Sequence, residues 1–97
     1  MKINKIGNGT EFTLVPEGKL DTLTAPQFRE FIESCTTETS KITLDLAQLT
    51  YLSSIGLSLI LSLKKKLGSS GTLRIVNAKG LVREVFEISG FADLLVN

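Results

Sequence analysis

The sequence contains no histidine and a single cysteine, Cys35. Without histidine the chain cannot form the serine–histidine pair on which conventional serine hydrolases depend, so an enzyme of that kind is excluded. A lone cysteine cannot form a disulfide within the chain, and this favours a reducing, cytoplasmic compartment. We expect Cys35 to pack in the core. Neither a GxGxxG nor a GxxxxGK[ST] motif is present, so we expect no nucleotide, cofactor or metal site.

An excess of one charge and a long apolar run are also missing. Eleven basic and ten acidic residues give a formal net charge of +1, which argues against direct nucleic-acid binding. The basic cluster Lys64-Lys65-Lys66 is interpreted as the last turn of a helix, where cations complement the dipole, in preference to a phosphate-binding patch. The leucine-rich segment 55–63 falls well short of the roughly 20 apolar residues that cross a membrane. We therefore expect a soluble protein without membrane insertion.

With 97 residues, 42% of them apolar, the chain can build one core, and we expect a single domain over residues 1–97. Turn signals and apolar periodicity predict two strands in hairpin order, followed by helices that alternate with strands. The predicted segments are strands 3–6 and 11–15, a helix from Thr24, strand 42–46, helix 54–67, strand 72–76, a helix over 81–86 and a short last strand 94–96. This order predicts an α/β fold with a mixed sheet and helices mainly on one face.

The first helix has a recognisable start. Thr24-Ala25-Pro26-Gln27 has the form of a capping box, with Thr24 as N-cap, a proline early in the first turn and Gln27 placed to reach back. Its apolar face is predicted from the helical spacing of Phe28, Phe31, Ile32 and Cys35, before residues 36–40 end the helix.

The most informative segment is Ser53-Ser54-Ile55-Gly56-Leu57, which joins the mostly apolar run 49–52 to the second long helix. The first backbone N–H groups of a helix lack internal partners, and the helix dipole is positive there. A serine at this position can therefore cap the helix or, once phosphorylated, place an anion in a favourable field. Local chemistry alone favours capping.

The second helix is predicted to have a polar stripe and a buried arc. The exposed stripe comprises Ser54, Ser58, Ser62 and Lys65. The buried arc comprises Ile55, Leu59, Ile60, Leu63 and Leu67. Gly56 lies within this arc, where the lack of a side chain allows a close approach to the sheet. Leu57 and Leu61 border the stripe, either as an apolar margin that receives a partner or as residues packed under a neighbouring helix.

Three segments together resemble STAS domains, in particular bacterial anti-sigma factor antagonists. Gly18-Lys19-Leu20-Asp21, followed by Thr24-Ala25-Pro26, is similar to the family's glycine-x-leucine-aspartate segment and first helix start. Ile42-Thr43-Leu44-Asp45-Leu46 resembles the strand before the signature loop. The segment from Tyr51 to Leu57 resembles the signature itself. The resemblance extends over nearly the whole chain and implies a STAS-like fold.

The resemblance implies that Ser54 is a phosphoacceptor. In this role the unphosphorylated protein binds a serine kinase that is also the anti-sigma factor, and it loses affinity on phosphorylation, which regulates sigma-factor-dependent transcription. A serine phosphatase is implied as a second partner. The implied partner surface comprises Asp21, Thr22, Ser53, Ser54, Ile55, Gly56, Leu57, Ser58 and Leu61. A phosphate adds about −1.5 to −2 charges, enough to disrupt a neutral contact without a change of fold.

Two positions depart from the family pattern, and alternatives remain open. Ser53 stands where many members carry aspartate, and Ile55 is bulkier than the usual small residue. Ser53 is an alternative phosphoacceptor if Ser54 caps the helix. Asp21 either contributes to the partner surface or stabilises a turn. The alternative function is a STAS adaptor subunit of a transport or signalling assembly that is not phosphorylated. The oligomeric state is not predicted.

Overall fold

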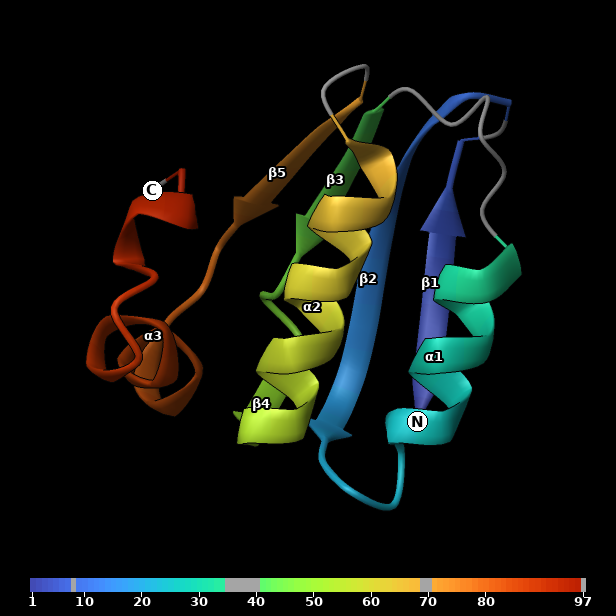
Figure 1. Cartoon of the computed structure of the whole chain (residues 1–97). Helices are drawn as coiled ribbons and strands as arrows, with labels where there is room; N and C mark the ends of the chain where they lie inside the picture. The colour runs from blue at the N-terminus through green and yellow to red at the C-terminus, as the bar shows by residue number, and fades with distance from the viewer. Residues whose placement is uncertain (8, 35–40, 69–70, 97) are drawn as a thin grey trace.

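The computed structural model describes residues 1–7, 9–34, 41–68 and 71–96. The predicted α/β fold is confirmed: within these ranges the chain forms a mixed five-stranded sheet and three α-helices (Figure 1). The elements are β1 (Lys2–Ile6), β2 (Glu11–Leu20), α1 (Ala25–Ser34), β3 (Lys41–Asp45), β4 (Leu49–Leu52), α2 (Ser54–Leu67), β5 (Thr72–Val76), α3 (Gly80–Ile88) and a 3-10 turn, η1 (Ala92–Leu94).

Strand β2 organises the sheet. It pairs antiparallel with β1, as the predicted hairpin requires, and parallel with both β3 and β4. Its first residues lie beside β3, and its last three lie beside β4, with a shift in register between Gly18 and Lys19. Strand β5 joins the far side of β3 in parallel. Helices α1 and α2 lie side by side on one face of this sheet (Figure 1).

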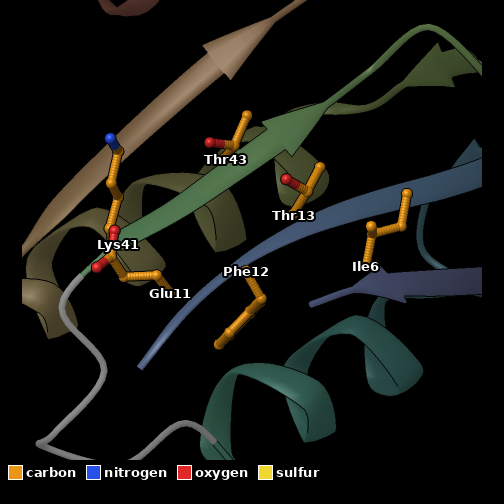
Figure 2. A pocket seen from close by; sticks show the side chains of 6 residues that line it. All are labelled: Ile6, Glu11, Phe12, Thr13, Lys41 and Thr43. Carbon is orange, nitrogen blue, oxygen red and sulfur yellow. The ribbon is translucent and has the colours of Figure 1, made fainter. Parts of the chain in front are cut away.

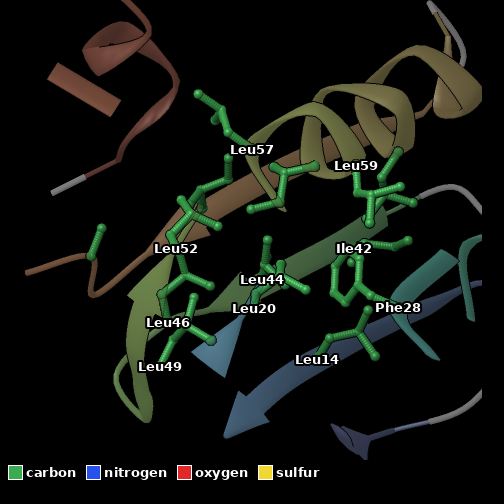
Figure 3. Packing of buried hydrophobic residues seen from close by; sticks show 14 of the residues in the cluster. Leu14, Leu20, Phe28, Ile42, Leu44, Leu46, Leu49, Leu52, Leu57 and Leu59 are labelled. Atoms are coloured by element: carbon green, nitrogen blue, oxygen red, sulfur yellow. The ribbon is translucent and has the colours of Figure 1, made fainter. Parts of the chain in front are cut away.

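The core lies between the sheet and the helices. Alternate residues of the strands point into it, such as Leu14 in β2 and Leu44 in β3, and both are fully buried. Helix α1 contributes Phe28 and α2 contributes Ile60 and Leu63 (Figure 3 shows part of this cluster). Burial of each large aliphatic or aromatic side chain stabilises the fold by about 1.5–3 kcal/mol, so this layer holds α1 and α2 on the sheet.

Strand β4 is a feature that the sequence did not predict. The predicted strand 42–46 ends at Asp45, where the carboxylate Oδ1 accepts a hydrogen bond from Ala47 N at 3.0 Å and closes a turn. A four-residue strand follows, with only its two end residues, Leu49 and Leu52, buried. An i, i+3 spacing over four residues lacks the alternation of a half-buried strand, so periodicity could not reveal β4.

Two predicted strand boundaries are wrong. Strand β2 extends to Leu20 and not to Val15, because pairing with β1 and β4 outweighs the poor strand propensity of Pro16 and Gly18. The predicted last strand is a 3-10 turn followed by an isolated parallel bridge between Leu95 and Ile75. The predictions for Cys35 and for residues 36–40 lie outside the described residues.

The basic cluster forms the last turn of α2, as predicted. Lys66 also reaches across to the neighbouring helix, where its Nζ donates hydrogen bonds to the carbonyl oxygens of Ile32 at 3.0 Å and Glu33 at 3.4 Å. These carbonyls belong to the last turn of α1, where a helix is electronegative and its acceptors lack internal donors. The ammonium group therefore ties the end of α2 to the end of α1.

Candidate functional site

Ser53 is the N-cap of helix α2. Its hydroxyl oxygen accepts a hydrogen bond from the backbone N–H of Gly56 at 3.3 Å, and its carbonyl accepts one from Leu57 N at 3.0 Å. Its own N–H donates to the carbonyl of Leu20 at the end of β2, at 3.0 Å. Ser53 is therefore committed to the junction, because all three of its polar groups hold the start of α2 in place.

Ser54 has a different environment. It is the first residue of α2, it is exposed, and its side chain makes no hydrogen bond within the part of the chain that the structure describes. The predicted polar stripe is confirmed, since Ser58, Ser62 and Lys65 are exposed on the same face. Of the two hydroxyls at the junction, only that of Ser54 is both accessible and uncommitted.

Gly56 lies where α2 comes closest to the sheet. A Cβ atom at this position would lie 2.7 Å from Cδ1 of Leu52, 2.8 Å from Cγ of Leu20 and 2.9 Å from the carbonyl oxygen of Leu20. Carbon atoms without a bond between them pack at about 3.5–4.0 Å, so no side chain fits here without a shift of the helix. The predicted close approach is confirmed, and it holds the first turn of α2 against the end of β2.

The loop between β2 and α1 is held by its own side chains. Asp21 Oδ1 accepts hydrogen bonds from the backbone N–H groups of Leu23 at 3.0 Å and Thr24 at 3.2 Å. The hydroxyl of Thr24 accepts one from Asp21 N at 3.0 Å and donates one to the carbonyl of Lys19 at 2.7 Å. The turn-stabilising alternative for Asp21 is confirmed.

The predicted capping box is wrong in detail. Thr24 does precede the first residue of α1, but its hydroxyl bonds back into the loop and not forward into the helix. Its N–H, which Gln27 was expected to reach, is already bonded to Asp21. Asp21 and Gln27 are each three residues from Thr24, but the carboxylate closes a compact turn, whereas Oε1 of Gln27 accepts a hydrogen bond from the N-terminal ammonium group of Met1 at 3.1 Å.

The structure brings the Asp21 loop and the serine junction together. Leu20 and Leu52 are paired at the ends of β2 and β4, and the two helices that follow start from this same edge of the sheet (lower edge in Figure 1). Asp21 is partly buried here, and Thr22 is exposed. The predicted surface residues at the two ends of the strands therefore lie on one side of the molecule.

Leu23 also lies at this edge of the sheet, and it was not among the residues predicted for the partner surface. Its side chain is 88% exposed, although its backbone is held by Asp21. A large apolar side chain on such a loop is well suited to insert into a partner's pocket, because the loop backbone that carries it is already ordered before binding. The available signal was an isolated leucine between Thr22 and Thr24, in a polar segment next to the glycine-x-leucine-aspartate motif.

The expected apolar margin of α2 is corrected. Leu57 is only 5% exposed and belongs to the core, so the alternative of packing under a neighbouring helix holds for this residue. Helix α3 contacts both α2 and β4 and covers this flank. Leu61 and Ile55 are partly buried, so Ile55 is less enclosed than the helical repeat predicted. The accessible apolar surface beside Ser54 is therefore offered by Ile55 and Leu61.

A separate hollow lies at the opposite end of the sheet. It is lined by Ile6, Glu11, Phe12, Thr13, Lys41 and Thr43, from the end of β1 and the starts of β2 and β3 (Figure 2). None of these residues was predicted to be functional. Among the described residues, no three acidic, cysteine or histidine side chains gather as a metal site. Nor does any helix within the described ranges have the length and apolar content to cross a bilayer.

The chain is similar to known proteins in sequence and in fold. BtrV of Bordetella bronchiseptica, a candidate anti-sigma factor antagonist, is 46% identical over 55 residues, which make up 56% of this chain and 47% of that protein. The match thus spans about half the length of this curated relative. An anti-sigma factor antagonist from Mycobacterium paratuberculosis has the same fold, with a TM-score of 0.85 at 19% identity over 98% of this chain and 82% of the other.

The fold is also that of SpoIIAA, an anti-sigma factor antagonist whose structure is known in two states. The unphosphorylated form superposes with a TM-score of 0.82 at 22% identity, over 98% of this chain and 86% of the other. The phosphorylated form, from Bacillus, gives 0.77 at 20% identity, over 98% and 89%. In addition, the family model for the STAS domain matches residues 2–97. This chain belongs to the STAS domain family.

Proposed function

We propose that this protein is an anti-sigma factor antagonist controlled by phosphorylation of Ser54. Unmodified, it binds an anti-sigma factor that is also a serine kinase, and the phosphorylated form loses that affinity, so that sigma-factor-dependent transcription is regulated. The observation that carries the proposal is the division of roles at the junction, where Ser53 caps α2 and Ser54 is left exposed. The likeness to named antagonists supports the same function.

The helix start suits a phosphate on Ser54. The hydroxyl of Ser53 satisfies the N–H of Gly56, while geometry leaves the first N–H groups of α2 without internal acceptors. A phosphate of about −1.5 to −2 charges is stabilised there by the helix dipole, so the fold need not change. The cost falls on the partner contact, since a doubly charged group must be desolvated at a surface built for a neutral hydroxyl.

The proposed contact surface combines the serine stripe with the neighbouring loop. Asp21 and Thr22 present the loop, and Ser53, Ser54 and Ser58 present polar groups. Ile55 and Leu61 supply partly exposed apolar area, to which we add Leu23. Gly56 and Leu57 act indirectly, because both are buried and set the position of the helix.

In this role the protein is a binding partner and a kinase substrate, and not itself an enzyme. A serine phosphatase would restore the unmodified form. The exchange between partners takes place in the cytoplasm, where kinase, phosphatase and sigma factor are found.

The test is to incubate the protein with ATP and a candidate anti-sigma factor kinase chosen from the genomic neighbourhood, and to map phosphate by mass spectrometry. We expect modification of Ser54, none in Ser54→Ala, and retained modification in Ser53→Ala. The phosphorylated protein should no longer bind the kinase. Unmodified Ser54 with intact binding would overturn the switch and support the adaptor function. Phosphate on Ser53 alone would overturn the assignment of the acceptor.

A further inference from the structure

A shallow apolar groove lies between strand β4 and helix α3. It has a volume of about 230 Å³ and is lined by Tyr51, Leu52, Leu81, Glu84, Val85 and Ile88. Three of the lining side chains are unusually exposed for large apolar residues: Tyr51 is 42%, Leu81 62% and Ile88 78% exposed. These residues do not belong to the proposed surface around Ser54.

Helix α3 has two apolar faces, and only one is used by the fold. Val82 and Phe86 are buried in the core. Leu81, Val85 and Ile88 follow at i, i+4 and i+7, a second stripe that faces the groove. A surface helix needs one apolar stripe to fold, and clustered exposed apolar side chains mark interaction sites. The second stripe is therefore available for a partner.

The size of the groove indicates what kind of molecule it receives. Small-molecule sites usually enclose about 300–1,000 Å³, and this groove is smaller and open. It matches one or two large side chains presented by a protein, the usual form of an interface anchor.

Charge decides between a second copy of this chain and a different partner. Glu84 borders the exposed stripe about midway between Leu81 and Ile88 along the helix, and it makes no ion pair within the described residues, whereas Glu87 is paired with Arg83 at 3.5 Å. An antiparallel two-fold contact between two α3 helices would set Glu84 of each copy against the other, where desolvation makes like charges costly. A partner with a cation opposite Glu84 avoids this cost.

We propose that this groove binds an amphipathic helix of a protein partner, which inserts large aliphatic side chains beside Tyr51 and Ile88 and places a lysine or arginine against Glu84. This is recognition of a helix in a groove, with anchors at helical spacing. The site is separate from Ser54, and its occupation does not require the phosphorylation switch.

The test uses the full chain and a designed probe, an amidated 14-residue helix with two leucines four residues apart and one arginine on the same face. We expect saturable binding in NMR titration, with shifts concentrated at Tyr51, Leu81, Val85 and Ile88. Ile88→Ser should weaken binding at least tenfold. Glu84→Arg should reverse the preference from the arginine peptide to a matched glutamate peptide by about two- to fivefold.

Ile6→Ser is the matched control, since Ile6 is also exposed but lies at the far end of the sheet, and it should bind the probe like the parent protein. Equal binding by Ile88→Ser, or the absence of localised shifts, would overturn the proposal. Concentration-dependent dimerisation that Ile88→Ser abolishes would assign the groove to a second copy instead. None of these readouts depends on Ser54, so their failure leaves the proposed switch standing.

Discussion

Helices α1 and α2 start from the same edge of the sheet, yet their first turns are held in different ways. The loop before α1 is closed on itself by the side chains of Asp21 and Thr24, and its remaining hydroxyl, that of the exposed Thr22, lies outside the helix. The start of α2 has two adjacent serines, of which Ser53 alone makes the structural contacts. The difference shows how the start of α2 combines a helix cap with an exposed hydroxyl, because the two are provided by separate residues.

The strongest test of the α2 junction is Gly56→Ala. The added methyl group would lie within 3 Å of atoms of Leu20 and Leu52, so the helix start must shift. We expect the free energy of unfolding to fall by about 1–3 kcal/mol, measured by urea denaturation. Ser62→Ala, on the exposed stripe of the same helix, is the control and should cost nothing. Equal stability of the two variants would show that the close approach is unimportant.

Ser54→Asp tests the residue that the junction leaves free. We expect binding to the anti-sigma factor kinase to weaken at least tenfold, because a carboxylate must be desolvated in the contact. The melting temperature should change by no more than about 2 °C, as for most exposed substitutions. Binding can be followed by calorimetry, with Ser54→Ala as the neutral control. Tight binding by the aspartate variant would contradict a charge-based switch.

Ser53→Ala tests the committed partner of the pair. Loss of the hydroxyl that accepts from Gly56 N should lower the free energy of unfolding by about 1 kcal/mol. Ser53→Asp should be nearly neutral, since aspartate is an equally good N-cap. Thermal unfolding of the two Ser53 variants and of Ser54→Ala compares how much each serine contributes to stability. Equal losses of stability in Ser53→Ala and Ser54→Ala would show that the two serines do not have separate roles.

Leu23→Ser probes the other helix start and should have the smallest effect on the fold. Because the side chain is almost fully exposed, we expect the free energy of unfolding to change by less than about 0.5 kcal/mol. Affinity for the kinase should fall about fivefold if this leucine anchors the contact. Thr22→Ser, on the same loop, provides a conservative control. Unchanged affinity would confine the partner surface to α2.

Turn signals and apolar periodicity predicted the order of most strands and helices, and the helical repeat predicted the main features of α2. The repeat of α2 placed Ser54 and Ser58 on an exposed stripe, and its glycine indicated a close approach, because both depend on the helix and the sheet beneath it. The burial of Leu57 was left open, since it depends on α3, whose position no local pattern reveals.

The choice between alternative hydrogen-bond partners was a second limit on what the sequence could predict. Around α1, both Asp21 and Gln27 could accept from the N–H of Thr24, and only the folded loop shows that the aspartate does so. The same holds for the serine pair, because either hydroxyl is chemically able to cap α2. At α2 the two serines were correctly singled out, whereas at α1 the predicted acceptor Gln27 was wrong, and both assignments required the folded structure.

The hydrogen bonds at the two ends of α2 bear on how fast the proposed switch can respond. Ser53 fastens the first turn to β2, and Lys66 fastens the last turn to the end of α1. Because both ends of α2 are bonded to neighbouring elements, a phosphate on Ser54 in the proposed switch would act on an arriving partner and not by turning the helix. The modified residue and the partner contact that it changes would then lie at the same site. In the proposed switch, the rate of the response would therefore be set by the enzymes that add and remove the phosphate.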